Sequence, residues 1–344
     1  MINKEFDYKK IMSFGKEVLS FASPSGYTNN VIDFLLKECL KRNVEAYKSN
    51  NGSLIATIKG ESDYVVGLAA HADTLGAMVK NINADGTLKF SPIGSPILPT
   101  YDGEYCKVIT REGKEYSATF LSNSPAIHVY KDSKTLSRNE ETMHVRLDEV
   151  VFSRDDVKKL GISNGDIIAI DPKTVITESG FIKSRFLDDK ISVALLFAVI
   201  DYLKENNITP KYTLKIIITV NEEEGFGASY VPEINELLAV DMGCVGMDLE
   251  GNEYKVSICA KDSGCPYNYD MTTRLINLSK KHNLDYAVDV FSYYSSDVLT
   301  ALKGGNNIKG ALIGSGVAAS HGMERTHIKG LINTFKLVLA YITE

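Results

Sequence analysis

The chain has 344 residues, of which 44% are hydrophobic and 24% are charged, and its formal net charge is −6. This ordinary composition excludes a disordered or collagen-like chain, and the acidic balance without a basic cluster argues against a nucleic-acid partner. Five scattered cysteines without a Cys-x-x-Cys pair indicate reduced thiols in a cytoplasmic protein, and the polar start and lack of ~18 continuous apolar residues argue against export or membrane insertion.

The first 75 residues predict one layer of an α/β fold. Helical periodicity covers Tyr8–Phe21 and Thr28–Lys41. Strands are expected at Glu45–Ser49 and Leu54–Ile58, on either side of an Asn-Asn-Gly turn that is typical of a hairpin. A buried strand follows at Tyr64–Ala70. The two helices should cover one face of the resulting sheet.

Residues 76–180 have a different texture, with short alternating segments joined by Gly, Pro, Asn and Asp. Their one clear helix begins at Ser153, where Asp156 completes a capping-box pattern, and ends at Gly161. We expect a mostly β inserted domain here. Because a chain of this length exceeds one small core, residues 1–75 and 181–344 are predicted to form a single α/β domain interrupted by that insertion.

The α/β texture returns after the insertion. A helix is predicted at Lys190–Leu203, followed by strands at Leu214–Val220 and Leu237–Val240. We expect the catalytic or binding groups of this part at the ends of those strands. Further helices are expected at Asp270–Lys281, from Ser296 and from Ile328, with strands at Tyr286–Phe291 and Ala311–Ile313.

Acidic and histidine motifs lie where predicted strands end or helices begin. His71-Ala72-Asp73 follows a buried strand, Asp188-Asp189 opens a helix, and Glu222-Glu223-Glu224 follows the end of another strand. Each is also typical of a common structural feature, namely a capped loop histidine, a helix N-terminus or a solvated acidic turn. An open α/β sheet gathers its ligands beyond the carboxyl ends of its strands, so their joint occurrence favours one site. Adjacent carboxylates resist ionising together unless a cation offsets them, which favours a divalent metal.

The ordered set resembles a known family. It comprises His71-x-Asp73, Leu187-Asp188-Asp189-Lys190, Glu222-Glu223 before Gly225, Val240-Asp241, and His321 with Glu324. It is similar to the glutamyl and leucyl aminopeptidase family of dinuclear metallopeptidases, often called TET-type. The resemblance covers nearly the whole chain. It implies a mixed-sheet α/β/α metallopeptidase domain whose insertion is a PDZ-like or barrel-like dimerisation domain, and homodimers or a homododecamer acting on short peptides.

The resemblance also implies roles for individual residues. Two divalent ions, Zn²⁺ or Co²⁺ with Mn²⁺ as a further possibility, would share Asp188, with His71 and Asp241 on the first and Glu223 and His321 on the second. Oxygen and imidazole ligands suit these metals. Glu222 would be the general base, Asp73 would orient His71, and the Asp188–Asp189 peptide bond would be cis. We expect Glu222 and Glu223 to point in different directions because neighbouring residues do so at the end of a strand.

Several alternatives stay open. Asp248 competes with Asp241 for the first metal, although Asp241 ends the better strand. Glu224 stands where the family more often has an apolar residue, so it adds a charge that could alter substrate preference. The segment before His321 lacks the Pro and Arg of many relatives. The remaining histidines are interpreted as surface or satisfied side chains at His128, His144 and His282, and as a supporting or structural one at His327.

The leading functional hypothesis is a cytoplasmic metal-dependent aminopeptidase that removes N-terminal residues from short peptides. A related dinuclear-metal amidohydrolase that deacylates N-acyl amino acids is the alternative within enzymes. A non-catalytic, metal-stabilised peptide-binding protein is the alternative from another class. An uncoordinated Glu222 argues against that last hypothesis, because a purely structural site needs no base.

Overall fold

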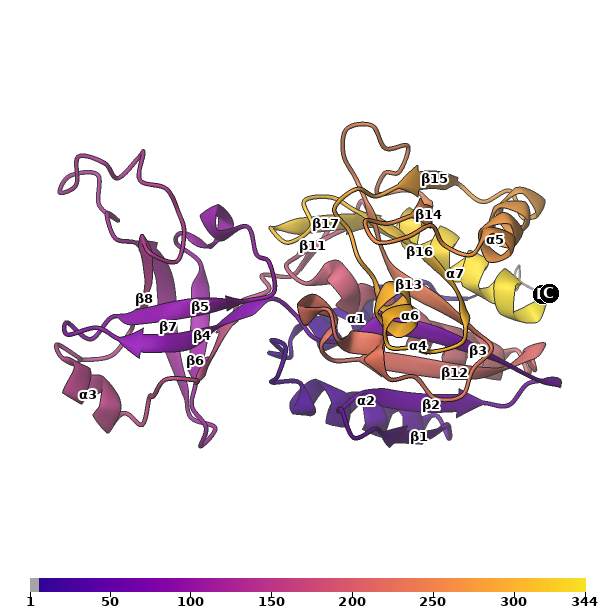
Figure 1. Cartoon of the computed structure of the whole chain (residues 1–344), viewed down its shortest axis with the longest axis horizontal. Coiled ribbons are helices and arrows are strands. Elements are labelled where there is room, and N and C mark those ends of the chain that lie inside the picture. The colour runs from indigo at the N-terminus through magenta and orange to yellow at the C-terminus, as the bar shows by residue number, and fades with distance from the viewer. Residues whose placement is uncertain (1–5) are drawn as a thin grey trace.

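An eight-stranded mixed sheet forms the centre of the larger part of the computed structural model, which describes residues 6–344 (Figure 1). Four of its central strands run parallel, so their carboxyl ends meet at one edge of the sheet. The strands lie in the order β1 (Glu45–Lys48), β2 (Leu54–Ile58), β12 (Tyr212–Thr219), β3 (Ser62–His71), β13 (Glu236–Cys244), β16 (Lys309–Val317), β14 (Val256–Lys261) and β15 (Tyr286–Val290).

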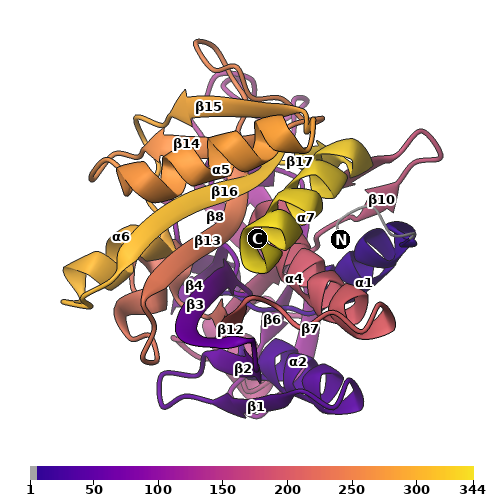
Figure 2. The ribbon, with the colours of Figure 1, turned by 90° about the vertical axis from the view of Figure 1, so that its right-hand side faces the viewer.

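Helices cover both faces of this sheet (Figure 2). Alternate residues of the central strands face opposite sides: Leu238 and Val240 join the core on one face, and Leu237 and Ala239 join the core on the other. The α/β/α layering expected from the sequence is therefore confirmed. One face carries α1 (Lys9–Leu19), α2 (Asn29–Lys41), α4 (Leu187–Glu205), α5 (Tyr269–Lys281) and α7 (Ile328–Thr343), and the other carries α6 (Asp297–Lys303).

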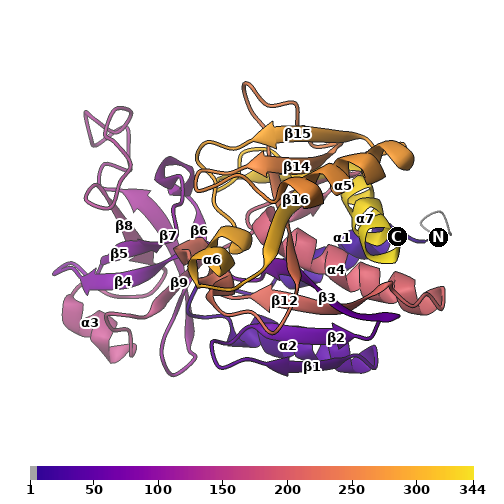
Figure 3. The same ribbon diagram turned by 45° about the vertical axis from the view of Figure 1, so that its right-hand side comes forward.

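A closed six-stranded barrel lies beside one end of the sheet (Figure 3). Its helix α3 (Arg154–Lys159) begins as predicted, because the Ser153 hydroxyl accepts the N–H of Asp156. The barrel lies within the predicted insertion, whose exact bounds and dimerisation role stay predictions. Its strands are β4 (Gly76–Ile82), β5 (Leu88–Ile93), β8 (Met143–Leu147), β7 (Glu115–Ser122), β6 (Tyr105–Ile109) and β9 (Ile167–Ile170).

Three strands outside the predicted β insertion were not foreseen, namely β14, β11 (Phe181–Ser184) and β17 (Glu324–His327). The last two form a small sheet with β10 (Val175–Ile176), which lies within the insertion. The strands β13 and β16 also continue further than predicted. In β16 the extension holds glycines, which usually indicate a loop, but a side chain at Gly314 would lie 2.1 Å from the carbonyl oxygen of Asp241. Close strand approach therefore requires glycine there.

Within residues 6–344, no helix combines the length and the hydropathy that a bilayer-spanning segment needs. The site is positioned by the sheet, by the helices on its two faces and by the barrel. The parallel strands β3, β12 and β13 are the important ones, because each carries or directly precedes predicted metal ligands at the same sheet edge.

Candidate metal centre

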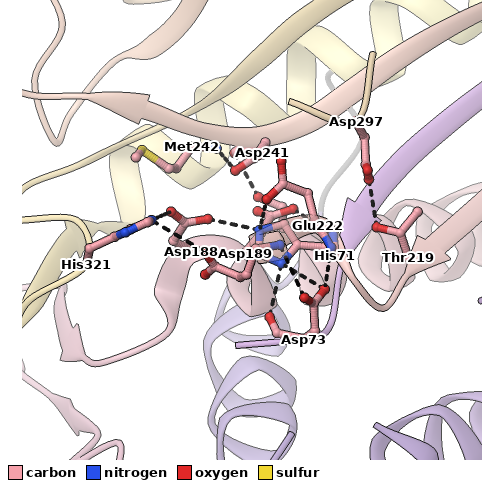
Figure 4. Close-up of polar contacts among 12 residues, drawn as sticks. His71, Asp73, Asp188, Asp189, Thr219, Glu222, Asp241, Met242, Asp297 and His321 are labelled. Carbon is pink, nitrogen blue, oxygen red and sulfur yellow. Dashed lines mark hydrogen bonds and ion pairs between the residues drawn. The ribbon is translucent and has the colours of Figure 1, made fainter. Parts of the chain in front are cut away.

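The predicted site residues converge at the carboxyl edge of the parallel strands (Figure 4). His71 is the last residue of β3, and Asp241 lies in β13. Asp188 and Asp189 lie in the first turn of α4, and the peptide bond between them is cis, as the resemblance implied. Different elements thus deliver acids and an imidazole to one small volume.

Asp188 is placed between the two predicted metal-binding histidines (Figure 4). Its Oδ1 lies 3.1 Å from Nε2 of His71, and its Oδ2 lies 3.7 Å from Nε2 of His321. Nε2 of His321 also lies 3.5 Å from Oε2 of Glu223. One carboxylate therefore faces both histidines, which is the geometry that a bridging ligand requires.

Two overlapping groups have donor atoms close enough to hold a cation. One is His71, Asp188 and Glu223, and the other is His71, Asp189 and Asp241. Within each group the donor atoms lie within 4.8 Å of one another. The donors are imidazole nitrogens and carboxylate oxygens, which suit a divalent ion such as Zn²⁺. Oδ1 of Asp189 is buried without a hydrogen-bond partner, so the residues present fit a metal.

Burial and mutual repulsion shift the pKa values of most of these acids upward. Asp188 is different, because its burial is outweighed by its contacts with His71, which lower its pKa. Burial, and next the charge of Asp188, raises the pKa of Asp241 to about 8. Burial and neighbouring carboxylates likewise raise the pKa values of Glu222 and Glu223 well above the usual range. Burial lowers the pKa of the His71 ring, but contacts with Asp188 and Asp73 raise it well above the ordinary value overall. Such a cluster of like charges favours a cation.

Asp73 supports the site differently from the expectation. Nδ1 of His71 donates to the backbone carbonyl of Asp73 at 3.0 Å, whereas the Asp73 carboxylate lies farther away, at 3.5 Å. That carboxylate instead accepts the N–H groups of Glu222 at 3.2 Å and Glu223 at 3.3 Å and the hydroxyl of Ser25 at 2.6 Å. Asp73 therefore fixes both the His71 ring, through its backbone, and the acidic turn, through its side chain.

The glutamates follow the end of β12, as predicted, and the turn that carries them is a 3₁₀ helix, η2 (Glu222–Glu224). Asp73 holds its first two N–H groups, while Oε1 of Glu224 accepts the N–H of Gly94 in the barrel at 2.7 Å. Glu224 is thus an anchor that reaches away to the barrel, which the sequence analysis did not foresee. Glu222 remains beside the metal groups, with its Oε2 3.8 Å from Nε2 of His71.

Two further acids that received no role from the sequence hold the site together. Glu324 accepts the N–H of His321 and the N–H of Asp188, both at 3.0 Å. Asp297 accepts the hydroxyl of Thr219 at 2.6 Å and the N–H of Ala228, in the 3₁₀ helix η3 (Gly227–Ser229), at 2.8 Å. Glu324 belongs to the ordered motif set named in the sequence analysis, which gave it no role of its own. For Asp297 no local signal separates this role from a helix N-terminus.

The structure also places the competing residues. Asp248 is exposed on the wall of the cleft and belongs to neither candidate metal group, whereas Asp241 is buried in one of them. His327 begins α7, because its Nδ1 accepts the N–H of Lys329. The cleft above the groups has a volume of about 620 Å³. Its apolar wall includes Met247, Leu249 and Phe291.

The stability of the chelator-treated protein should depend on pH. Burial, and next the charge of Asp188, raises the pKa values of Asp241 and Glu324 to about 8, against about 4 in unfolded chains. The folded protein thus binds more protons, so the free energy of unfolding falls as pH rises from about 4 to 8. We therefore expect the difference in thermal stability between the protein with added Co²⁺ and the protein with EDTA to grow as pH rises from about 4 to 8. Thermal unfolding under both conditions at several pH values measures it. A pH-independent effect of Co²⁺ would contradict the prediction.

Comparison with known proteins places the chain in a family. The family model described as M42 glutamyl aminopeptidase matches residues 52–337. The provisionally named aminopeptidase YhfE of Bacillus subtilis is 45% identical over 337 residues, with 97% of each chain covered. An aminopeptidase structure from Desulfurococcus kamchatkensis shares the fold with a TM-score of 0.86 at 22% identity, covering 98% of this chain and 95% of that one.

The Pyrococcus horikoshii TET1 peptidase, described as assembling into a tetrahedron or a large octahedral shell, has a TM-score of 0.85 at 19% identity. The alignment covers 97% of this chain and 99% of that one. These likenesses confirm the resemblance and the fold inferred from the ordered motifs, and the family match covers most of the chain. The chain belongs to the M42 glutamyl aminopeptidase family of peptide hydrolases.

Proposed function

We propose that the protein is a metal-dependent aminopeptidase that removes N-terminal residues from short peptides in the cytoplasm. The observation that carries the proposal is the convergence of His71, His321 and several carboxylates, of which His321 and four of the acids line a 620 Å³ cleft. Membership of the aminopeptidase family supports the same reaction class. The five described cysteines are all free, in keeping with a reducing compartment.

In this proposal Asp188 would be shared by two divalent ions. His71 and Asp241 would complete the first site, and Glu223 and His321 would complete the second. The contacts of His71 with Asp188 and of His321 with Glu223 support this assignment. When bound, ions of this kind supply Lewis-acid polarisation of the scissile carbonyl and activation of the attacking water. The backbone carbonyl of Asp73 and the carboxylate of Glu324 hold the two histidines in place. Zn²⁺ and Co²⁺, and then Mn²⁺, are the proposed ions.

Glu222 is the proposed general base. It lies beside both candidate metal groups and belongs to neither, and its Oε2 is 3.8 Å from the His71 ring. Burial raises the pKa of this carboxyl well above its usual range, so it holds a proton more readily than an exposed glutamate. Glu222 would accept a proton from the attacking water and deliver it to the leaving amine.

The charge of the cleft favours an aminopeptidase over a deacylase of N-acyl amino acids. Among the described residues, the cleft lining carries five carboxylates and no lysine or arginine. Two divalent ions would offset four of those charges. A peptide N-terminus is a cation and suits such a wall, whereas an N-acyl amino acid carries a carboxylate that would need a basic partner. A non-catalytic peptide-binding role is disfavoured because it leaves Glu222 without a purpose.

The variant Glu222→Gln should separate catalysis from metal binding. We expect kcat to fall by about 10²–10⁴-fold, because the amide cannot take up the proton, while metal content stays at the wild-type level. Metal analysis and hydrolysis of an amino-acid anilide measure the two quantities. Glu233→Gln, at an exposed position, is the matched control and should match wild type. Wild-type activity in Glu222→Gln would show that the base is another group.

A substrate panel tests the reaction class and the terminal residue. We expect leucine anilide to be hydrolysed faster than glutamate anilide by at least about tenfold, because the cleft has apolar walls and its described lining offers no cation to an acidic side chain. N-acyl amino acids should not be hydrolysed, and chelation should abolish turnover. Activity on the acylated compounds alone would favour the deacylase, and no activity on either set would favour the binding protein.

We also propose that the protein forms homodimers or a homododecamer through the barrel. The TET1 structure of Pyrococcus horikoshii, which shares the fold, is described as a tetrahedron or octahedral shell. An insertion of this size also exceeds the ~4–6 residues of an ordinary connection, which is consistent with an interface role. Light scattering on the purified chain should give a mass of at least two copies. A monomeric mass at working concentration would contradict the proposal.

A further inference from the structure

A short segment of the barrel reaches the candidate metal centre. Residues 94–97, here called the strap, lie between β5 and the 3₁₀ helix η1 (Leu98–Tyr101). The N–H of Gly94 donates to Oε1 of Glu224 at 2.7 Å. Nδ1 of His321 donates to the carbonyl of Ser95 at 2.9 Å, and the N–H of Ile97 donates to the carbonyl of His321 at 3.1 Å. Three hydrogen bonds thus join the barrel to two neighbouring parts of the site.

The close approach of the strap to the metal centre requires glycine at position 94. Its φ is +69°, a conformation that other residues rarely adopt, and a side chain there would lie 2.4 Å from Leu75 and 3.5 Å from Glu223. A second tie lies next to the strap, where the buried guanidinium of Arg185 donates to the carbonyls of Thr100 at 2.7 Å and Gly322 at 3.1 Å. The strap therefore packs directly against the turn that carries Glu223.

The strap touches one half of the site. Its hydrogen bonds go to His321 and to Glu224, the neighbour of Glu223. The other half is held from within the α/β part, since Nδ1 of His71 donates to the carbonyl of Asp73 and Oδ1 of Asp241 accepts the N–H of Met242 at 2.7 Å. The second metal site of the proposed function thus has a support from the barrel, in addition to Asp73 and Glu324 of the α/β part.

We infer that the strap positions the second metal site, with Glu224 as its anchor. Because a carbonyl can only accept, the contact with Ser95 keeps the proton on Nδ1 of His321 and leaves Nε2 free as a ligand toward Glu223. Glu224 holds the end of η2 through Gly94, which restricts the turn bearing Glu223. Glu224 and the strap are positioning elements, and the inference rests on the ligand assignment in the proposed function.

The variant Glu224→Ala should weaken one metal site selectively. Chelator-treated full-length protein is titrated with Co²⁺ by calorimetry, and the event that His321→Ala removes marks the second site. Glu224→Ala should weaken that event by about 10–100-fold, which is typical of losing a partner that orients ligands, and leave the other event unchanged. Glu224→Gln keeps an acceptor oxygen for Gly94 and should recover most of the affinity. Equal weakening of both events, or no weakening, would overturn the inference.

Control variants separate positioning from folding. Glu115→Ala removes an exposed barrel carboxylate that pairs with Lys107 at 2.8 Å, and both events should match wild type. Should Glu224→Ala fail to fold, Ile97→Pro replaces it as the test variant. The φ of Ile97 is −77°, which proline can adopt, and the residue is 47% exposed, so the main loss is the N–H that donates to His321. The same selective loss is expected, and unchanged events would overturn the inference.

The titration also distinguishes this inference from the proposed function. Two Co²⁺ events with a selective loss in Glu224→Ala, but no hydrolysis of any anilide by the wild type, would support the strap and reject the aminopeptidase. A single event in the wild type, unaffected by His321→Ala, would overturn the strap together with the assignment of the second site. The hydrolysis measurements on wild type would then still decide the reaction class.

Discussion

The repulsion among buried carboxylates at the sheet edge is the constraint on which the rest of this structure depends. Asp188, Glu223 and Asp241 are crowded around His71, and burial removes the water that would screen them. Without a cation, the pKa values of Glu223 and Asp241 rise and these two acids retain protons more readily, whereas the burial of Asp188 is outweighed by contacts with His71 that lower its pKa. With a divalent cation, the same crowding becomes a ligand set. The structure around this edge therefore has to hold together carboxylates that would otherwise repel one another apart.

The architecture meets this constraint with short, rigid connections. Parallel strands bring His71 and Asp241 to the same edge, and the first turn of α4 places Asp188 between the two histidines. Close packing of β16 against β13 depends on Gly314, because any side chain at this position would clash with the backbone of Asp241. Further acids accept hydrogen bonds from backbone N–H groups near the ligands. The Glu324 carboxylate in this way links the segments of Asp188 and His321, which are far apart in sequence.

The barrel contacts the candidate metal centre, although most of it lies away from the sheet. In the ribbon views it is a separate lobe, yet its connection after β5 accepts or donates hydrogen bonds at His321 and Glu224. An insertion that supplies an assembly surface and also supports a ligand would couple the two roles physically. Glu224, an extra charge when seen in the sequence, is explained by that contact, because its carboxylate is directed to a backbone N–H rather than to the metal groups.

The sequence by itself determined the order of the elements, the β texture of the insertion and the family, because periodicity, turn residues and motif order are local properties. It also singled out the residues that converge at the edge. Tertiary structure alone decided how they are held: Asp73 supports η2 with its carboxylate, and Asp241 rather than Asp248 is buried in a metal group. Strand β17 was missed because its four residues, Glu324–His327, are polar and show no apolar alternation, and its pairing with β11 appears only in the fold. Contacts across long sequence separations leave no periodic signal, so only the folded chain reveals them.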